Sequence, residues 1–121
     1  MSDLYIGTDL VDVDRIKISI EKYQTKFLDR VFSTEEQEYC HSKSNPAIHY
    51  AGRFAAKEAV IKSIKSSGFD KNIELRSIRI INNSDGSPHV DLDIKYNGIV
   101  KVSISHTETH AIAFALFELN H

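Results

Sequence analysis

The apolar positions follow two different periods along the chain, and the change of period separates a helical part from an extended part. The segment from Leu4 to Val11 is apolar on both faces, which is typical of a buried strand. The residues after it, up to about Ser66, favour helices. We expect these helices over residues 13–23, 26–31, 34–42 and 46–66.

Two of the expected helices carry start signals. Ser33 is followed three residues later by Glu36, which is the arrangement of a capping box. Pro46 follows Asn45 and favours the first turn of the long helix, which should end before Gly68.

From Leu75 onward the hydrophobic period becomes two, which predicts strands. Asn97-Gly98 predicts a hairpin turn, and the nearly all-apolar segment from Ala111 to Phe117 predicts a buried last strand. A strand, a run of helices and a series of strands predict one α+β domain over residues 1–121, with a mostly antiparallel sheet packed against the long helix. The alternating strand positions are Ile78, Ile80, Val90, Leu92, Ile94, Val100, Val102 and Ile104.

Asp9 interrupts the first apolar strand. Aspartate is unfavourable in strands, and no basic residue lies near it within this strand. Gly7 permits the close approach of another backbone or of a ligand. Asp9 therefore either caps the following helix, a role for which Asp12 is better placed, or presents a carboxylate to a ligand.

Glu58 stands within the apolar stripe of the long helix. At about 100° per residue, Phe54 and Ile61 lie on its side of the helix axis, and so does Lys62. An unpaired buried charge costs several kcal/mol. Glu58 therefore forms a surface ion pair on a rotated helix, pairs with Lys62, or holds a cation. If Asp9 shares its cleft, the two carboxylates suit Mg²⁺.

Two motifs resemble those of the bacterial holo-acyl-carrier-protein synthases, the small stand-alone class of 4′-phosphopantetheinyl transferases. They are Ile6-Gly7-Thr8-Asp9-Leu10-Val11 with Arg15-Ile16, and Arg53-Phe54-Ala55-Ala56-Lys57-Glu58-Ala59 with Lys62. Three shorter matches agree in order and spacing, so the resemblance spans nearly the whole chain. They are Val31-Phe32-Ser33-Thr34-Glu35-Glu36, Asp85-Gly86-Ser87-Pro88 and Val102-Ser103-Ile104-Ser105-His106-Thr107.

The resemblance implies an enzyme of fatty acid biosynthesis. It would move the phosphopantetheine arm of coenzyme A to a serine of apo-acyl carrier protein and release adenosine 3′,5′-bisphosphate. Asp9 and Glu58 would anchor Mg²⁺ at the pyrophosphate, and Lys62 would contact the same phosphates. A metal-activated water, Asp9 and Glu58 stay open as proton acceptors.

The resemblance also implies contacts to coenzyme A away from the metal. His106 ends a strand in a turn with Ser105 and Thr107, where backbone N–H groups can face the nucleotide end of coenzyme A. Gly86 and Pro88 of the Gly-x-Pro turn belong to the same expected surface.

Lys43 and Arg53, together with His106, would contact the adenosine 3′-phosphate. Arg53 projects about 140° away from Glu58 on a regular helix, so it should reach the far end of coenzyme A or another subunit. The remaining histidines lack metal-ligand spacing, and surface or capping roles suit them better. They are His41, His49, His89, His110 and His121.

Two positions depart from the family pattern. Tyr96-Asn97-Gly98 stands where members commonly carry a short helix, and we expect a tight turn there. Ser87 stands where a lysine is frequent, which removes one phosphate contact.

Charge is distributed unevenly along the chain. The segment from Val13 to Phe32 contains five basic residues and three acidic ones, although the net charge of the whole chain is −2. Such a run is commonly a solvated face, but the family docks acidic acyl carrier proteins there. Arg15 matches the family's docking arginine. Lys22, Lys26 and Arg30 extend the expected docking face by charge and spacing.

Composition narrows the class of protein. The net charge argues against a general nucleic-acid binder. Cys40 is the one cysteine, which excludes an internal disulfide and fits a reducing compartment. The sequence shows no membrane-spanning run and no secretory leader, so we expect a cytoplasmic protein. A homotrimer is implied by the resemblance alone.

Two other functions fit parts of the sequence. A non-enzymatic module that binds carrier proteins could keep the basic first helix, but it would not need Asp9, Glu58 and Lys62 together. A Mg²⁺-dependent nucleotide hydrolase could use the same carboxylates, and it would release product from coenzyme A without a carrier protein.

Overall fold

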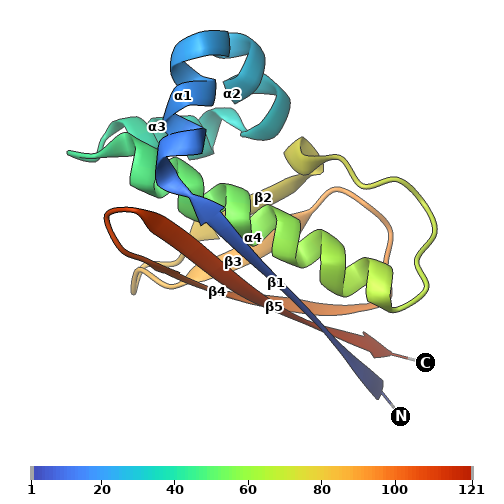
Figure 1. Ribbon diagram of the computed structural model, residues 1–121. Coiled ribbons are helices and arrows are strands. Elements are labelled where there is room, and N and C mark those ends of the chain that lie inside the picture. The colour runs from blue at the N-terminus through green and yellow to red at the C-terminus, as the bar shows by residue number, and fades with distance from the viewer. Residues whose placement is uncertain (1, 121) are drawn as a thin grey trace.

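The computed structural model describes residues 2–120 as an α+β fold, which confirms the predicted class (Figure 1). Strand β1 leads into four helices, a short 3₁₀ segment and four further strands. The elements are β1 (Ser2–Asp12), α1 (Val13–Tyr23), α2 (Thr25–Val31), α3 (Thr34–His41), α4 (Pro46–Ser66), η1 (Leu75–Ser77), β2 (Ile78–Asn82), β3 (Pro88–Leu92), β4 (Gly98–His106) and β5 (His110–Asn120).

The long helix α4 lies across one face of a three-stranded antiparallel sheet in the order β1-β5-β4 (Figure 1). A Cβ added at Gly7 would stand 2.1 Å from the carbonyl oxygen of Ala59. Glycine at this position is therefore what allows the backbones of β1 and α4 to approach so closely. This contact fixes the position along α4 at which β1 crosses the helix.

The side chains of this sheet alternate between a buried and an exposed face. Ala111, Ala113, Ala115 and Phe117 face α4 and are buried. The strands predicted over 4–11 and 111–117 are confirmed, but their burial on both faces is not found within one chain, because every second residue points to the exposed face. The exposed apolar side chains on that face of β1 and β5 include Leu4, Ile6, Leu10, Ile112 and Phe114.

Local capping sets where the first helices begin. The Asp12 carboxylate accepts a hydrogen bond from the Asp14 N–H and caps α1. Ser33 and Glu36 form the predicted capping box of α3, with hydrogen bonds of 2.8 and 3.2 Å. Gln24, at φ 50°, separates α1 from α2. The expected helix boundaries are thus confirmed to within one residue or two.

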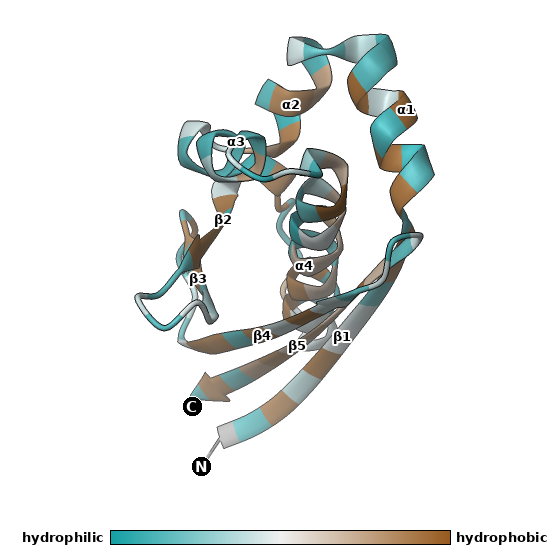
Figure 2. Cartoon of the chain, turned by 90° about the vertical axis from the view of Figure 1, so that its left-hand side faces the viewer, coloured by the Kyte–Doolittle hydropathy of each residue, from teal (hydrophilic) through white to brown (hydrophobic). Residues whose placement is uncertain are grey.

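Strands β2 and β3 form a separate two-stranded sheet beside α4, next to β4, as Figure 2 shows. The hairpin predicted at Asn97-Gly98 was wrong. Asn97 pairs with Asn120 through its side-chain amide and its carbonyl, so Asn97 opens the pairing of β4 with β5. The tight turn of this sheet lies instead between His106 and His110, where the Thr107 N–H donates to the His110 carbonyl.

A fully buried ion pair ties α4 to the elements around it. The Lys57 ammonium lies 2.7 Å from a Glu36 carboxylate oxygen and also donates to the carbonyls of Val31 and Ile78. The second Glu36 oxygen accepts from the Ile80 N–H. Because both charges have these partners, their burial is compensated, and α2, α3, α4 and β2 meet at one point.

Among residues 2–120, none of the helices combines the length and the apolar character that crossing a bilayer requires.

Candidate metal and phosphate site

Asp9 and Glu58 line the same pocket, which has a volume of about 590 Å³. Asp9 belongs to the middle of β1 and does not cap α1, since Asp12 does. It stands on the face of β1 that also carries buried Gly7 and Val11, and its side chain is 18% exposed. Glu58 reaches the pocket from α4. The strand and the helix therefore bring together two carboxylates that lie 49 positions apart in the sequence.

Electrostatics in this pocket oppose ionisation of Glu58. Burial raises the pKa of its carboxyl group, and the neighbouring Asp9 carboxylate raises it further, while Lys62 acts in the opposite direction. Lys62 forms its salt bridge with Asp9, at 3.2 Å, and also donates to the Thr8 carbonyl. The sequence left open a pair between Lys62 and Glu58 within the helix. In the structure, Lys62 pairs instead with Asp9 of β1.

The donor set fits a hard divalent cation that keeps solvent or substrate oxygens. Two carboxylates face one pocket, and the raised pKa of Glu58 records a repulsion that a cation between Asp9 and Glu58 would remove. No group of three or more histidine, cysteine, aspartate or glutamate residues suited to enclosing a metal occurs within the described part of the chain. The pair therefore suits Mg²⁺ better than a closed zinc site.

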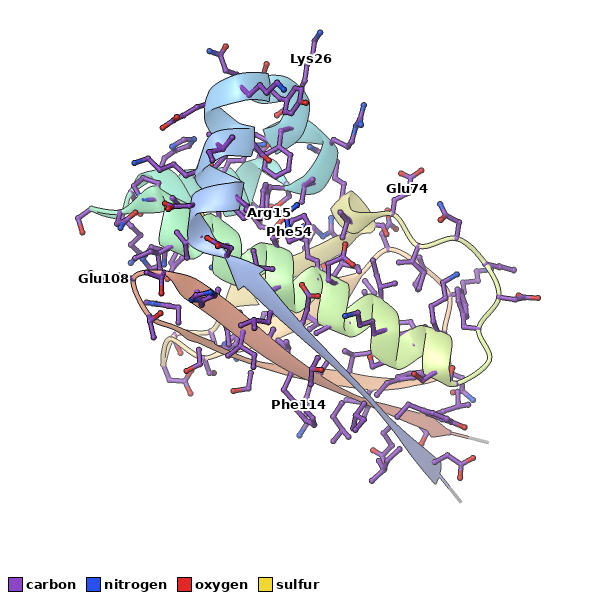
Figure 3. All side chains as sticks on the ribbon, in the orientation of Figure 1. Arg15, Lys26, Phe54, Glu74, Glu108 and Phe114 are labelled. Carbon is purple, nitrogen blue, oxygen red and sulfur yellow. The ribbon has the colours of Figure 1, made fainter. Side chains whose placement is uncertain are left out.

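Arg15 of α1 and Phe54 of α4 line the same pocket, and Figure 3 shows them between these two helices. Ser19 and Phe27 connect the pocket to a second groove of about 390 Å³ between α1 and α2. This groove carries the basic side chains that continue the charge of Arg15 outward. It is lined by Ser19, Tyr23, Lys26, Phe27 and Arg30.

The expected basic face is formed by two helices, α1 and α2, and not by one continuous helix. The helical spacing from Lys22 to Lys26 crosses the break at Gln24, so it does not describe one continuous helix face. The packing of α2 against α1 brings Lys26 and Arg30 to the groove instead, while the Lys22 ammonium lies over the Tyr23 ring.

A second cluster of polar groups surrounds the ring of Tyr39 on α3. The Arg53 guanidinium lies 4.0 Å and the Lys43 ammonium 4.6 Å from the centre of this ring. The ring of His49 packs edge-on against Tyr39 at 5.8 Å, and His106 packs against His49 at the same distance. Lys43, Arg53 and His106, which the sequence assigned to one phosphate, are thus brought together around Tyr39 and His49.

Arg53 is held from the side of β2. Its guanidinium donates to the Asn82 side-chain oxygen at 2.7 Å, and its Nε–H is buried without a partner. Asn82 ends β2 directly before the turn that contains Gly86 and precedes Pro88. The Gly-x-Pro turn therefore follows the strand that orients Arg53.

Ser105 and Thr107 lie beside His106 and line a shallow hollow of about 250 Å³ with Leu10, His110 and Ile112. The Thr107 N–H is engaged by the β-turn, and the Thr107 hydroxyl accepts from the His110 N–H. The backbone N–H of Thr107 therefore donates within the hairpin and is not available to a ligand, in contrast to the expectation.

Helix α4 separates the two clusters. Glu58 meets β1, whereas Arg53 meets β2, and Figure 2 shows these strands on opposite sides of the helix. This agrees with the angle expected between the two side chains. Glu58 and Arg53 therefore leave α4 on different sides.

The family model of the 4′-phosphopantetheinyl transferase superfamily matches residues 5–115. The chain belongs to this superfamily. Two of its similar relatives are holo-[acyl-carrier-protein] synthases. That of Thermodesulfovibrio yellowstonii is 45% identical over 92% of this chain and 95% of its own length, and that of Protochlamydia amoebophila is 40% identical over 94% and 97%.

Solved structures of the superfamily share the fold. A holo-[acyl-carrier-protein] synthase from Helicobacter pylori, in complex with coenzyme A, is 30% identical with a TM-score of 0.78, over 93% of this chain and 98% of that one. A Bacillus anthracis synthase, in complex with CoA (3′,5′-ADP), is 29% identical with a TM-score of 0.82, over 96% of each chain.

Sequence reasoning missed Tyr39 and His49. A tyrosine and a histidine ten positions apart carry no motif, and their contact depends on the angle between α3 and α4. Cys40 was expected to be structural, and it is fully buried, which raises the pKa of its thiol to about 12.

Proposed function

We propose that the chain transfers the 4′-phosphopantetheine arm of coenzyme A to a serine of apo-acyl carrier protein, with Mg²⁺ held by Asp9 and Glu58. The observation that carries the proposal is that these two carboxylates, from the two superfamily motifs, face one pocket. That Arg15 of the first motif lines the same pocket supports a carrier-protein serine reaching it.

The residues of this pocket match the demands of phosphoryl transfer. When bound, the metal supplies Lewis acidity at the pyrophosphate. Lys62 lies one turn from Glu58, and its side chain, 55% exposed, can turn its ammonium from Asp9 to a phosphate oxygen. Asp9, Glu58 and a water on the cation are the candidate acceptors for the serine proton. The partner protein supplies the nucleophile.

The acidic carrier protein would dock along α1 and α2. Arg15, Lys26 and Arg30 border a continuous path from the outer groove to the carboxylate pocket, and Figure 3 shows Lys26 at its far end. Opposite charges on the two surfaces would speed association and fix orientation.

One substrate molecule must use both clusters, and in this proposal it does so between two copies of the chain. The Tyr39 cluster and the carboxylate pocket lie on opposite sides of α4, so the phosphates of one coenzyme A would meet the pocket of one copy and the cluster of another. The exposed apolar face of the β1-β5-β4 sheet, with Ile6 and Phe114, supplies the surface for a homotrimer.

The test is a mass measurement on apo-acyl carrier protein incubated with the chain, coenzyme A and Mg²⁺. The carrier protein should gain about 340 Da, the mass of the arm. Asp9→Asn or Glu58→Gln should slow the gain by about 100-fold or more while the fold is retained. Release of adenosine 3′,5′-bisphosphate at an equal rate without a carrier protein would instead identify a hydrolase.

A further inference from the structure

The cation cluster is formed by Lys43, Arg53 and His106 around the Tyr39 ring, and it contains a second histidine, His49. His49 lies between the Tyr39 ring and the His106 ring, at 5.8 Å from each, and among residues 2–120 the titratable groups that act on its pKa are His106, Lys43 and Arg53. Its side chain is partly exposed. A ligand that reaches His106 and the cations on Tyr39 therefore also reaches His49.

The charges that act on His49 all have the same sign. Burial lowers its pKa below 6.5, and His106, Lys43 and Arg53 lower it further. The nearest hydrogen-bond partner of Arg53 is the neutral amide of Asn82, and the Arg53 Nε–H has none although only 5% of the residue is exposed. The charged groups that lower the pKa of His49 are all basic, and an incoming anion would balance them.

We propose that His49 is a specificity residue for the 3′-phosphate of coenzyme A, and that it takes up a proton from solvent when this phosphate enters the cluster. The inference rests on the proposed function, since it names the end of coenzyme A that the cluster binds. Without the phosphate, His49 stays neutral beside the cations of Lys43 and Arg53. A dianion placed among them balances the charges of Lys43 and Arg53 and pairs with the imidazole ring directly, so the charged imidazolium becomes the favoured form.

Proton uptake distinguishes this role from simple packing. No bond is broken, and the one proton moves from the buffer to the imidazole. A phosphate monoester has its second pKa near 6, so slightly above neutral pH the phosphate is already a dianion, and its own titration contributes little. Coenzyme A lacking the 3′-phosphate should bind without the uptake.

The experiment is calorimetry of coenzyme A and of 3′-dephospho-coenzyme A at about pH 7.5, in two buffers of different ionisation enthalpy. We expect coenzyme A to bind the native protein with uptake of about half a proton or more per site, and the dephospho form to bind with none. In His49→Phe, which keeps an aromatic ring, the uptake should fall below half its native value. Coenzyme A affinity should fall about fivefold.

His41→Phe is the matched control. His41 packs edge-on against Tyr50 at 5.4 Å and lines a different hollow, between α1 and the start of α4. This variant should show native proton uptake. His49→Gln should lose the uptake as His49→Phe does, which separates the loss of the titrating group from a change in ring packing.

A titration of the His49 ring protons by NMR gives the same answer without a substitution. Its pKa should rise on addition of adenosine 3′,5′-bisphosphate. Native uptake in both His49 variants, or an unchanged His49 pKa with the ligand bound, would overturn this inference and leave the proposed function standing. Failure of coenzyme A to bind the native protein would overturn both.

Discussion

Glu58 carries its carboxylate into a pocket where burial and the Asp9 carboxylate both favour the protonated form. A group whose pKa is raised in the folded state makes the fold less stable as the pH rises above its ordinary value, here 4.5. A cation bound between the two carboxylates removes this penalty. At the scale of single residues, the ionised Glu58 carboxylate therefore lowers the stability of the metal-free fold.

Glu58→Gln removes the ionisation and tests this cost. Without divalent ions the variant should have a higher Tm than the native chain at about pH 8, and the difference should vanish towards about pH 4, where both states are protonated. Added Mg²⁺ should raise the native Tm and leave the variant unchanged. Glu38→Gln, at an exposed position of α3, is the control and should not follow this pattern. A native protein more stable than Glu58→Gln at high pH without metal would contradict the assignment.

At the scale of elements, the Lys57–Glu36 pair and Gly7 together hold α4 in the orientation that the site needs. Lys57 fixes α4 against α2, α3 and β2, while the following residue, Glu58, faces the pocket. Gly7 fixes the contact with β1 on the other side of the helix. The rotation of α4 about its axis, which separates Glu58 from Arg53, is thus set from both sides.

Lys57→Met should destabilise the fold by about 3–5 kcal/mol, because it leaves the Glu36 charge buried without its partner. The change is measured by urea unfolding. Lys65→Met removes a lysine from the same helix whose ammonium makes an exposed hydrogen bond to the Lys71 carbonyl, and it should cost less than about 1 kcal/mol. Equal losses in the two variants would show that the buried pair has no special role.

The helices were predictable because their signals are local. The capping pair Ser33 and Glu36, and the proline at the start of α4, act within one turn of the helix. The hairpin at Asn97-Gly98 failed because Asn97 is engaged by Asn120, a partner 23 positions away that no local pattern reveals.

The site was predictable only in part for the same reason. Asp9 and Glu58 stood out as carboxylates in apolar surroundings, and the family motifs linked them. The neighbours of His49 depend instead on how α3, α4 and β4 pack against one another, and no local sequence pattern predicts this packing.

At the scale of the whole molecule, one side of the principal sheet is left open. Ile6 is 59% exposed and Phe114 44%, on adjacent strands, and Figure 3 shows Phe114 pointing away from α4. The sequence indicated strands apolar on both faces, and in one chain only one face is covered. A second copy on the open face would account for this apolar surface.

If the native protein forms the proposed trimer, the double variant Ile6→Lys with Phe114→Lys should sediment as a monomer, because it places two charges in the apolar contact. Transfer activity should fall with the trimer, since we propose that each site lies between two copies. Ile18→Lys alters an exposed isoleucine of α1, outside the sheet, and should leave the trimer intact. A monomeric native protein with full activity would contradict the shared site.

Arg15→Glu tests how the whole surface recognises its carrier protein. The affinity for apo-acyl carrier protein should fall by about tenfold at low salt and by less at high salt, because the contact is electrostatic. Binding of coenzyme A should weaken less than binding of the carrier protein, although Arg15 also lines the carboxylate pocket. Surface plasmon resonance at two salt concentrations measures both, and an unaltered carrier-protein affinity would exclude Arg15 from the docking surface.

The account depends above all on Asp9 and Glu58 sharing one ion. The direct measurement is Mn²⁺ binding in the presence of coenzyme A, followed by electron paramagnetic resonance, for the native protein, Asp9→Asn, Glu58→Gln and the double variant. Each single change should weaken binding by about tenfold or more, and the double variant should lose less than the sum of the two free-energy changes, because both residues hold the same ion. Native affinity in either single variant would contradict the account.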